Sequence, residues 1–324
     1  MAGVVLMAGA TARANSIIIN PTFDSSITSL AGAASVEGAI NAAVAELEGS
    51  IASPNNITVS IDFQNMSTGL GQSETTIYAL SYYAYYNAFK AVATSANQLT
   101  ALASLGTDPT GFGSGNPVNG STQVDITSAE GRNLGFNTPG GVTAGSGTYD
   151  SIIGLNTSIT SPPNGLSGYY GLEAVALHEM DEVLGIGGPS STLTGSGSLT
   201  GAIGDLDLFR YSAAGVRSYS NTQTTSKYSY FSIDGGATVL SYFNQTSGAD
   251  FADWLSNPIP SGFGAQVQDA FGGTGTNPSL GVNELTALNA IGYDVQSASS
   301  PEPSTLLLSG SVLAILAGVR RLRR

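Results

Sequence analysis

One stretch, residues 173–188, most constrains what this chain can fold into. It reads EAVALHEMDEVLGIGG and contains the only histidine among 324 residues, with three acids within the next four positions. Residues 174–184 show helical spacing of apolar positions, which places His178 and Glu182, four residues apart, on one face. Those two side chains can therefore reach the same ion. Asp181 lies off the midline between them, and we expect it to be solvated.

The order of these residues is similar to the zinc-peptidase motif H-E-x-x-H, with a glutamate in place of the second histidine. Glu179 takes the position of the general base, and Gly185 that of the glycine at which metzincins turn the chain out of the helix. The third metzincin ligand position is Gly188, which has no side chain. A ligand must then come from elsewhere, and we choose Asp207 in the segment DLDLFRYS. Asp205 is the alternative, because alternation along a strand would place both acids on one face.

Several short motifs together resemble the PEP-CTERM predicted metalloprotease family. They are HEMDEVLG, DLDLFRYS, YFSIDGG, ADFADW and a C-terminal tail that begins Pro301-Glu302-Pro303. The resemblance implies an α+β fold, with a zincin or metzincin-like catalytic domain built from a small mixed sheet and an active-site helix. It also implies a secreted metal-dependent endopeptidase that hydrolyses protein or peptide substrates. His178, Glu182 and Asp207 would hold Zn²⁺, with Mn²⁺ or Ca²⁺ as alternatives because carboxylates suit harder ions. Glu179 would take a proton from the attacking water.

The composition narrows the class of protein. Apolar residues make up 41% and aromatic residues 8%, enough for a packed core, while only 10% of residues are charged. This balance favours an extracellular, loop-rich protein. Half of the ten lysines and arginines lie near the termini, so a nucleic-acid groove is not expected. The absence of cysteine excludes disulfides and thiolate metal sites.

Both ends of the chain carry targeting patterns. Residues 1–14 end in Ala-x-Ala and suggest the remnant of a signal peptide. After a linker at 297–300, residues 301–324 combine Pro-Glu-Pro, an apolar helix at 306–319 and an arginine cluster. This order resembles the PEP-CTERM sorting signal. It implies recognition of Pro301-Glu302-Pro303 by an exosortase-type enzyme, transient anchoring in the inner membrane, and export to the envelope, outer surface or matrix of a Gram-negative bacterium.

The body, 15–296, is predicted as one metalloprotease-like domain, with an upper part at 15–188 that contains the metal helix 174–184 and a lower part at 189–296. Residues 151–159 are expected to form an edge strand that binds extended substrate by β-addition. The tyrosine cluster after residue 77 is expected in the core. Helices are predicted at 33–51, across 73–105, at 128–134 and at 283–293, and strands at 57–63, 123–126 and 228–234.

Some residues and functions stay open at this point. Asp234 suits a turn, Asp250 and Asp253 are candidates for calcium, and Arg210 either pairs with an acid or lies at the surface. Two other functions compete with a peptidase. One is an inactive protease-like surface or matrix protein that binds a partner, and the other is a structural protein whose acids bind calcium. Only a peptidase requires Glu179.

Overall fold

The computed structural model describes residues 16–161, 166–193, 201–219 and 228–296. The predicted leader 1–14, linker 297–300 and tail 301–324, with its apolar helix 306–319, lie outside these residues. The described residues form a mixed α/β structure with several small sheets. None of the helices in these ranges is both long and apolar enough to cross a bilayer.

The largest sheet has four strands in the order β1 (Ile17–Phe23), β3 (Ile57–Asn65), β9 (Ser151–Leu155) and β4 (Gly71–Thr75). The first three are parallel, and β4 runs antiparallel to β9 at the edge. The strand predicted at 57–63 is confirmed. Its alternating apolar side chains are buried, because one face of the sheet packs on helices: Ile57, Val59, Ile61 and Phe63.

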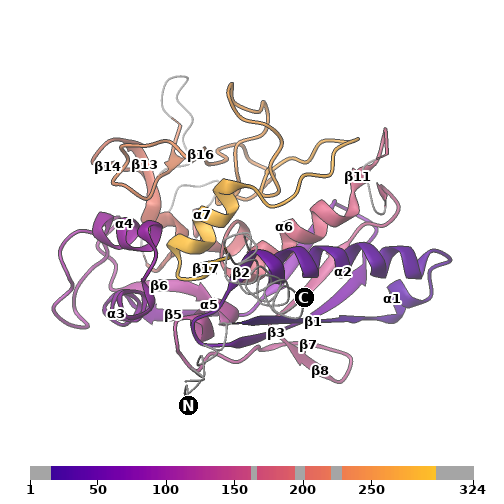
Figure 1. Ribbon diagram of the computed structural model, residues 1–324, viewed down its shortest axis with the longest axis horizontal. Coiled ribbons are helices and arrows are strands. Elements are labelled where there is room, and N and C mark those ends of the chain that lie inside the picture. The colour runs from indigo at the N-terminus through magenta and orange to yellow at the C-terminus, as the bar shows by residue number, and fades with distance from the viewer. Residues whose placement is uncertain (1–15, 162–165, 194–200, 220–227, 297–324) are drawn as a thin grey trace, which may run out of the picture.

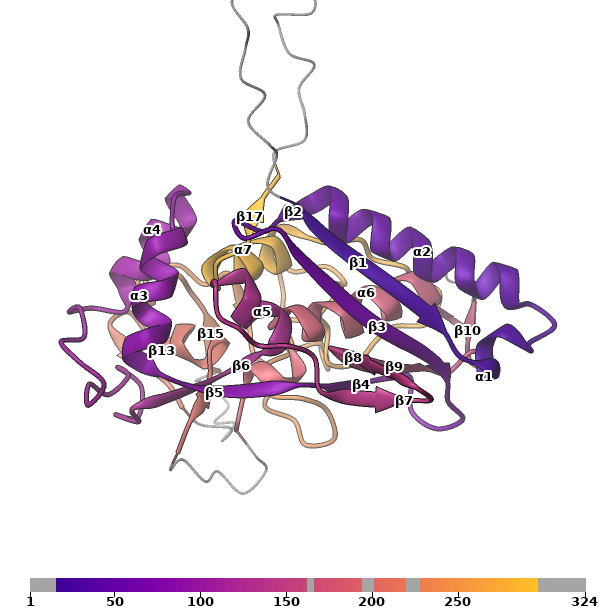
Figure 2. The same cartoon turned by 90° about the horizontal axis from the view of Figure 1, so that it is seen from below.

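Two helices, α2 (Ala33–Ser50) and α6 (Leu172–Leu184), lie behind this sheet in Figure 2 and pack against each other. The helix predicted at 33–51 is confirmed, and its apolar spacing directs a buried face toward the core. Each fully buried aliphatic side chain of this face stabilises the fold by roughly 1.5–3 kcal/mol. The face consists of Val36, Ala39, Ile40, Ala43, Val44 and Leu47. Helix α6 also packs against β4, the edge strand of the sheet.

A second sheet corrects the helical prediction for 73–105. Residues 71–75 form β4, and β5 (Ile77–Ser81) pairs with β6 (Gln123–Thr127), which in turn pairs with β12 (Ile203–Gly204). Helix begins only at α3 (Tyr82–Val92), capped by the Ser81 side chain, and continues in α4 (Ala96–Ser104). Pairing with distant strands outweighs the local helical pattern. The aromatic cluster is core, as predicted, through Tyr82, Tyr85, Tyr86 and Phe89.

The strand predicted at 151–159 as a substrate-binding edge is also corrected. It forms the shorter β9, which lies between β3 and β4 and has both hydrogen-bonding sides occupied. The strand at the edge beside α6 is β4 instead. This error follows from the helical prediction for 73–105. Residues 73–75, expected to be helical, belong to the edge strand β4.

The remaining elements surround α6. The predicted helices at 128–134 and 283–293 are present as α5 (Ser128–Asn133) and α7 (Val282–Ala290), and the strand predicted at 123–126 is β6. Of the strand predicted at 228–234, only β15 (Tyr230–Phe231) forms, inside the sheet β14-β13-β15-β16. The short elements are α1 (Ser25–Thr28), β2 (Ile51–Ala52), β7 (Val142–Ala144), β8 (Gly147–Tyr149), β10 (Thr160–Ser161), β11 (Tyr170–Gly171), η1 (Gly188–Ser190), η2 (Leu206–Phe209), β13 (Arg210–Ala213), β14 (Val216–Arg217), β16 (Ser241–Tyr242) and β17 (Asp294–Val295).

The long segment between β16 and α7 passes over the side of α6 away from the sheet (Figure 1). Two parts of it are joined by backbone hydrogen bonds: Trp254 N donates to Gln268 O at 2.7 Å, and Ala270 N donates to Trp254 O at 3.0 Å. Asp253 and Gln268 are therefore held side by side above α6.

Candidate metal centre

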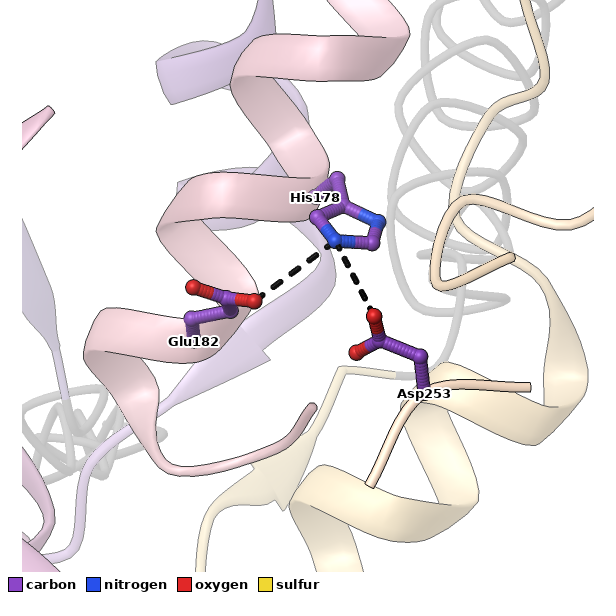
Figure 3. A group of neighbouring side chains, drawn as sticks. All are labelled: His178, Glu182 and Asp253. Carbon is purple, nitrogen blue, oxygen red and sulfur yellow. Dashed lines mark ion pairs between the residues drawn. The ribbon is translucent and has the colours of Figure 1, made fainter. Parts of the chain in front are cut away.

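Three side chains converge above the middle of α6 (Figure 3). His178 and Glu182 project from the helix, and Asp253 faces them from the overlying segment. His178 Nε2 lies 3.6 Å from Glu182 Oε1 and 3.7 Å from Asp253 Oδ2. The three side chains are only 17%, 6% and 3% exposed. A histidine and two acids thus form a compact, nearly buried set of donors.

The end of α6 explains how the chain accommodates a carboxylate at the second ligand position. Gly185 ends the helix in a left-handed conformation with φ of 110°, and Gly188 also has a positive φ, of 26°. A Cβ atom added to Gly188 would collide with the Glu182 carboxylate. Gly188, at the third ligand position of the motif, has no side chain to bind a metal. It leaves the space that the Glu182 carboxylate occupies.

The orientation of the imidazole suits a metal ligand. His178 Nδ1 lies 2.9 Å from the carbonyl oxygen of Val267. A carbonyl only accepts, so Nδ1 carries a proton, and Nε2 is the ring nitrogen left to bind a metal ion. Metal-ligating histidines are held in this way by a second hydrogen bond.

Gln268 and Glu284 form a second layer around the three donors. Gln268 Nε2 donates to Asp253 Oδ1 at 2.9 Å and lies 3.3 Å from His178 Nε2, while Gly188 N donates to the same Asp253 oxygen at 3.1 Å. Asp253 Oδ2 is left facing the histidine. On α7, Glu284 Oε1 accepts from Trp254 Nε1 at 3.0 Å and Gln268 N at 3.3 Å. This buried carboxylate holds the Trp254 side chain and the Gln268 backbone, one in each of the two segments that bear on the site.

Glu179 lies in the same cavity as the three donors. The cavity has a volume of about 510 Å³ and is bounded by α6, by β4 and by the segment from 248 to 278. Only 5% of Glu179 is exposed, and a Cβ atom on Gly71 of β4 would collide with its carboxylate. Ser73 Oγ, two residues further along β4, donates to Glu182 Oε2. The edge strand thus contacts both Glu179 and Glu182.

Several acids share this cavity, and their pKa values reflect it. Burial and the neighbouring Glu182 raise the pKa of Glu179 well above its usual value. Burial raises the pKa of Asp253 to about 7 although His178 acts in the opposite direction. Burial disfavours a charged His178, but Asp253, Glu182 and Glu179 outweigh it and raise the pKa of the imidazole. A cation placed among these groups would stabilise the carboxylates.

The donor set fits a divalent metal ion. Donors on a tetrahedral ion with bonds of about 2.0–2.2 Å lie about 3.4 Å apart, close to the 3.6 and 3.7 Å measured from His178 Nε2. The orientation of the His178 ring and the surplus of acidic groups in the cavity also favour a bound cation. One nitrogen and two carboxylates are compatible with Zn²⁺ and also with the harder Mn²⁺.

The third ligand expected at Asp207, or alternatively at Asp205, is not in this group. Asp207 lies in η2, fully buried, and its Oδ1 is 3.0 Å from Arg210 Nε. Ser191 Oγ also donates to it, at 2.8 Å. Asp205 precedes η2 rather than lying on a strand, and neither acid lines the cavity. Asp207 serves a buried ion pair, which also settles where Arg210 lies.

Asp181 is the other correction on α6. It was expected to be solvated, yet it is fully buried, because α6 packs against α2, α5, β4 and β9. Burial raises the pKa of Asp181 well above its usual value, with Glu284 as the next contribution. Asp234 forms the predicted turn, since its Oδ1 accepts from Ser232 Oγ at 2.7 Å and from Thr238 N at 2.9 Å.

Sequence reasoning placed Asp253 among candidate calcium ligands but not at the histidine. The available signal was its position in ADFADW, one of the motifs of the family resemblance. Gln268 and Glu284 carried no signal, because their roles depend on contacts across 90 and 30 residues of chain, respectively. No protein-family model, curated protein or solved structure matches this chain.

Proposed function

We propose that the protein is an exported, metal-dependent endopeptidase. The observation that carries the proposal is the convergence of His178, Glu182 and Asp253 in the cavity that also contains Glu179. Residues 71–73 of β4 line this cavity. The tail pattern at 301–324, outside the described residues, supports export through PEP-CTERM sorting by an exosortase-type enzyme.

Each side chain has a defined task in the proposed reaction. His178 Nε2, Glu182 and Asp253 hold a divalent ion, which supplies Lewis acidity that polarises a peptide carbonyl and acidifies water. Glu179 accepts a proton from the attacking water and passes it to the leaving amine.

The substrate is proposed to bind along β4. In the described part of the chain, the side of β4 away from β9 has no strand partner. An extended peptide could add there by main-chain hydrogen bonds, as in β-augmentation. Because Gly71 and Ser73 of β4 contact Glu179 and Glu182, such a peptide would lie beside the proposed base.

Metal content and activity test this proposal. We expect near-stoichiometric zinc or manganese by elemental mass spectrometry in the wild type, and loss of that metal in His178→Ala. On an unfolded, labelled protein substrate, Glu179→Gln should keep the metal but lower kcat about 10²–10⁴-fold. A wild-type protein that binds neither metal, even when metal is added, would refute the proposal.

One observation favours a second function, that of an inactive protease-like protein that binds a partner. Two of the three donors are carboxylates, so the ion is less acidic than one bound by three neutral imidazoles. A protein that retains the metal but not hydrolysis would fit this ligand set. In that case Glu179→Gln would leave every measured property of the protein unchanged, whereas His178→Ala would still abolish metal binding.

A further inference from the structure

A second group of acids lies by the C-terminal end of α6, and neither acid lines the cavity. Glu130 of α5 and Asp205 are 0% and 1% exposed, and their carboxyl groups lie next to each other. β6 leads into α5, and β12 leads to Asp205. Since β12 and β6 are parallel, the chain segments that carry the two acids both begin at the same end of this strand pair. The fold therefore brings together two acids that are 75 residues apart in the sequence.

No basic side chain among the described residues balances the negative charge of these two carboxylates. Among the described residues, neither Glu130 nor Asp205 forms an ion pair with a lysine, arginine or histidine. Two buried carboxylates without a counter-ion are strongly unfavourable. Burial raises the pKa of both groups well above their usual values, and for Glu130 the Asp205 carboxyl adds to the effect.

Other buried polar side chains in this part of the fold also lack hydrogen-bond partners. Asn133 follows Glu130 by one helical turn and is 2% exposed, and both atoms of its amide lack a hydrogen-bond partner. The same holds for the hydroxyls of Tyr85 and Tyr293, which are fully buried. After burial, the charges of Glu130 and Asp205 are among the causes that raise the pKa of each tyrosine, so both tyrosines lie within range of these charges.

The group also contacts the helix that bears the metal centre. Glu130 Oε2 would lie 2.9 Å from a Cβ atom on Gly185, and Ile291 Cδ1 would lie 3.1 Å from it. Asn133 Nδ2 would lie 3.3 Å from a Cβ atom on Gly292. Helix α5 and the C-terminal ends of α6 and α7 thus meet at the two acids.

A shared proton satisfies only part of this group. One proton between Glu130 and Asp205 pairs one oxygen of each acid and leaves their other oxygens, the Asn133 amide and both tyrosine hydroxyls without partners. Calcium takes six to eight oxygen ligands and accepts carboxylates and amide carbonyls. The donors are all oxygens, with no imidazole or thiolate, which favours a hard ion over zinc.

We propose that Glu130, Asp205 and the Asn133 side-chain oxygen bind a calcium ion, with the hydroxyls of Tyr85 and Tyr293 completing its surroundings. This site is separate from the His178 centre and does not depend on peptidase activity. Its role is structural, because it fixes α5 and the start of η2 against the end of α6.

Thermal unfolding of the full chain, after chelation and dialysis, tests the site with Ca²⁺ alone and with Mg²⁺ as the comparison ion. Calcium at a hundredfold excess over its Kd should raise the Tm by roughly 5–10 °C. The shift should persist in His178→Ala and in the surface-turn control Asp234→Asn. It should be lost in Asp205→Asn and Glu130→Gln.

A double variant, E130Q with D205N, guards against loss of folding, because it removes the buried charge while keeping the shapes of both side chains. We expect it to fold without calcium and to have a Tm that does not respond to the ion. A wild-type Tm that ignores Ca²⁺ would overturn the proposal in favour of a shared proton. A calcium shift that survives in the double variant but disappears in His178→Ala would place the ion in the cavity instead, and would also overturn it.

Discussion

The choice of third ligand is decided at single residues. Asp207 and Asp253 are both buried acids in the lower part of the chain, but their partners differ. Asp207 bonds to Arg210, whose guanidinium carbon also lies 3.8 Å above the ring of Phe243. Asp253 bonds to Gln268 and Gly188 and faces His178. One carboxylate balances an arginine, and the other is available to a metal.

Substituting each acid by asparagine should therefore separate stability from metal binding. Asp253→Asn should lose the metal, because an amide is a weaker ligand than a carboxylate, and should change the Tm of the metal-free protein little. Asp207→Asn should destabilise the fold by about 3–5 kcal/mol, since it leaves a buried guanidinium uncompensated, yet retain metal at low temperature. Elemental analysis and denaturant unfolding measure the two effects. The reverse pattern would restore Asp207 as the ligand.

Gln268 offers a second test at residue scale. Its amide holds Asp253 Oδ1, so Gln268→Ala should weaken metal binding by about 10–100-fold, the usual cost of removing a partner of a ligand. Competitive titration against a metal-sensitive dye gives the affinity. Gln266→Ala is the matched control, because Gln266 lines the same cavity and bonds to Ser241 and Asn283 rather than to a ligand. Tighter binding in Gln268→Ala would show that the amide competes with the ion.

At the scale of elements, the contact between α6 and β4 determines whether Glu179 can act. Gly71 is the point of closest approach, where any side chain would meet the Glu179 carboxylate and Val175. The glycine lets the edge strand lie directly against the helix. The proposed base is therefore positioned by a strand as well as by its own helix.

We expect Gly71→Ala to lower kcat at least about tenfold, because displacement of Glu179 disturbs proton transfer. Metal content should stay at the wild-type level, since the nearest atoms to a Cβ at Gly71 belong to Glu179 and Val175 and not to a metal-binding residue. Gly111→Ala, at a position with open space around it, serves as the control. Unchanged kinetics in Gly71→Ala would mean that β4 does not position the base.

The predicted secondary structure is confirmed where the apolar periodicity of a segment matches the face that it buries. The buried spacing of α2 and the alternation of β3 were both confirmed. Residues 73–81 were misassigned as helix, because a segment of serine, threonine and tyrosine pairs as strand once β9 and β6 lie beside it. Those partners come from residues 123–155, so local sequence could not reveal them.

At the scale of the whole molecule, excess negative charge shapes stability. The formal net charge is −13, and several acids are buried in the described structure. Burial raises the pKa of Asp269, in the wall of the cavity, to about 7, as it does for Asp253. The metal-free fold therefore holds protons that the unfolded chain releases.

The stability of metal-free protein should fall as pH rises from about 4 to 7. Aspartates titrate near pH 3.9 in the unfolded chain and near 7 here, so the folded state binds more protons across this interval and rising pH favours unfolding. Urea unfolding across this range, with chelator present, measures the slope. Adding zinc should flatten it, and Asp269→Asn should reduce it. Stability that increases with pH would contradict the burial of these acids.

The sequence by itself determined the local features: the helix that bears His178, Glu179 and Glu182, the turn at Gly185, and the lack of a ligand at Gly188. These follow from spacing and backbone conformation, which are set within a few residues. Only the tertiary structure decided that Asp253 faces the histidine, that Asp207 is committed to Arg210, and that β4 rather than β9 forms the edge. Such assignments depend on which distant segments pack together, and burial and pairing energies that act across the chain determine that packing.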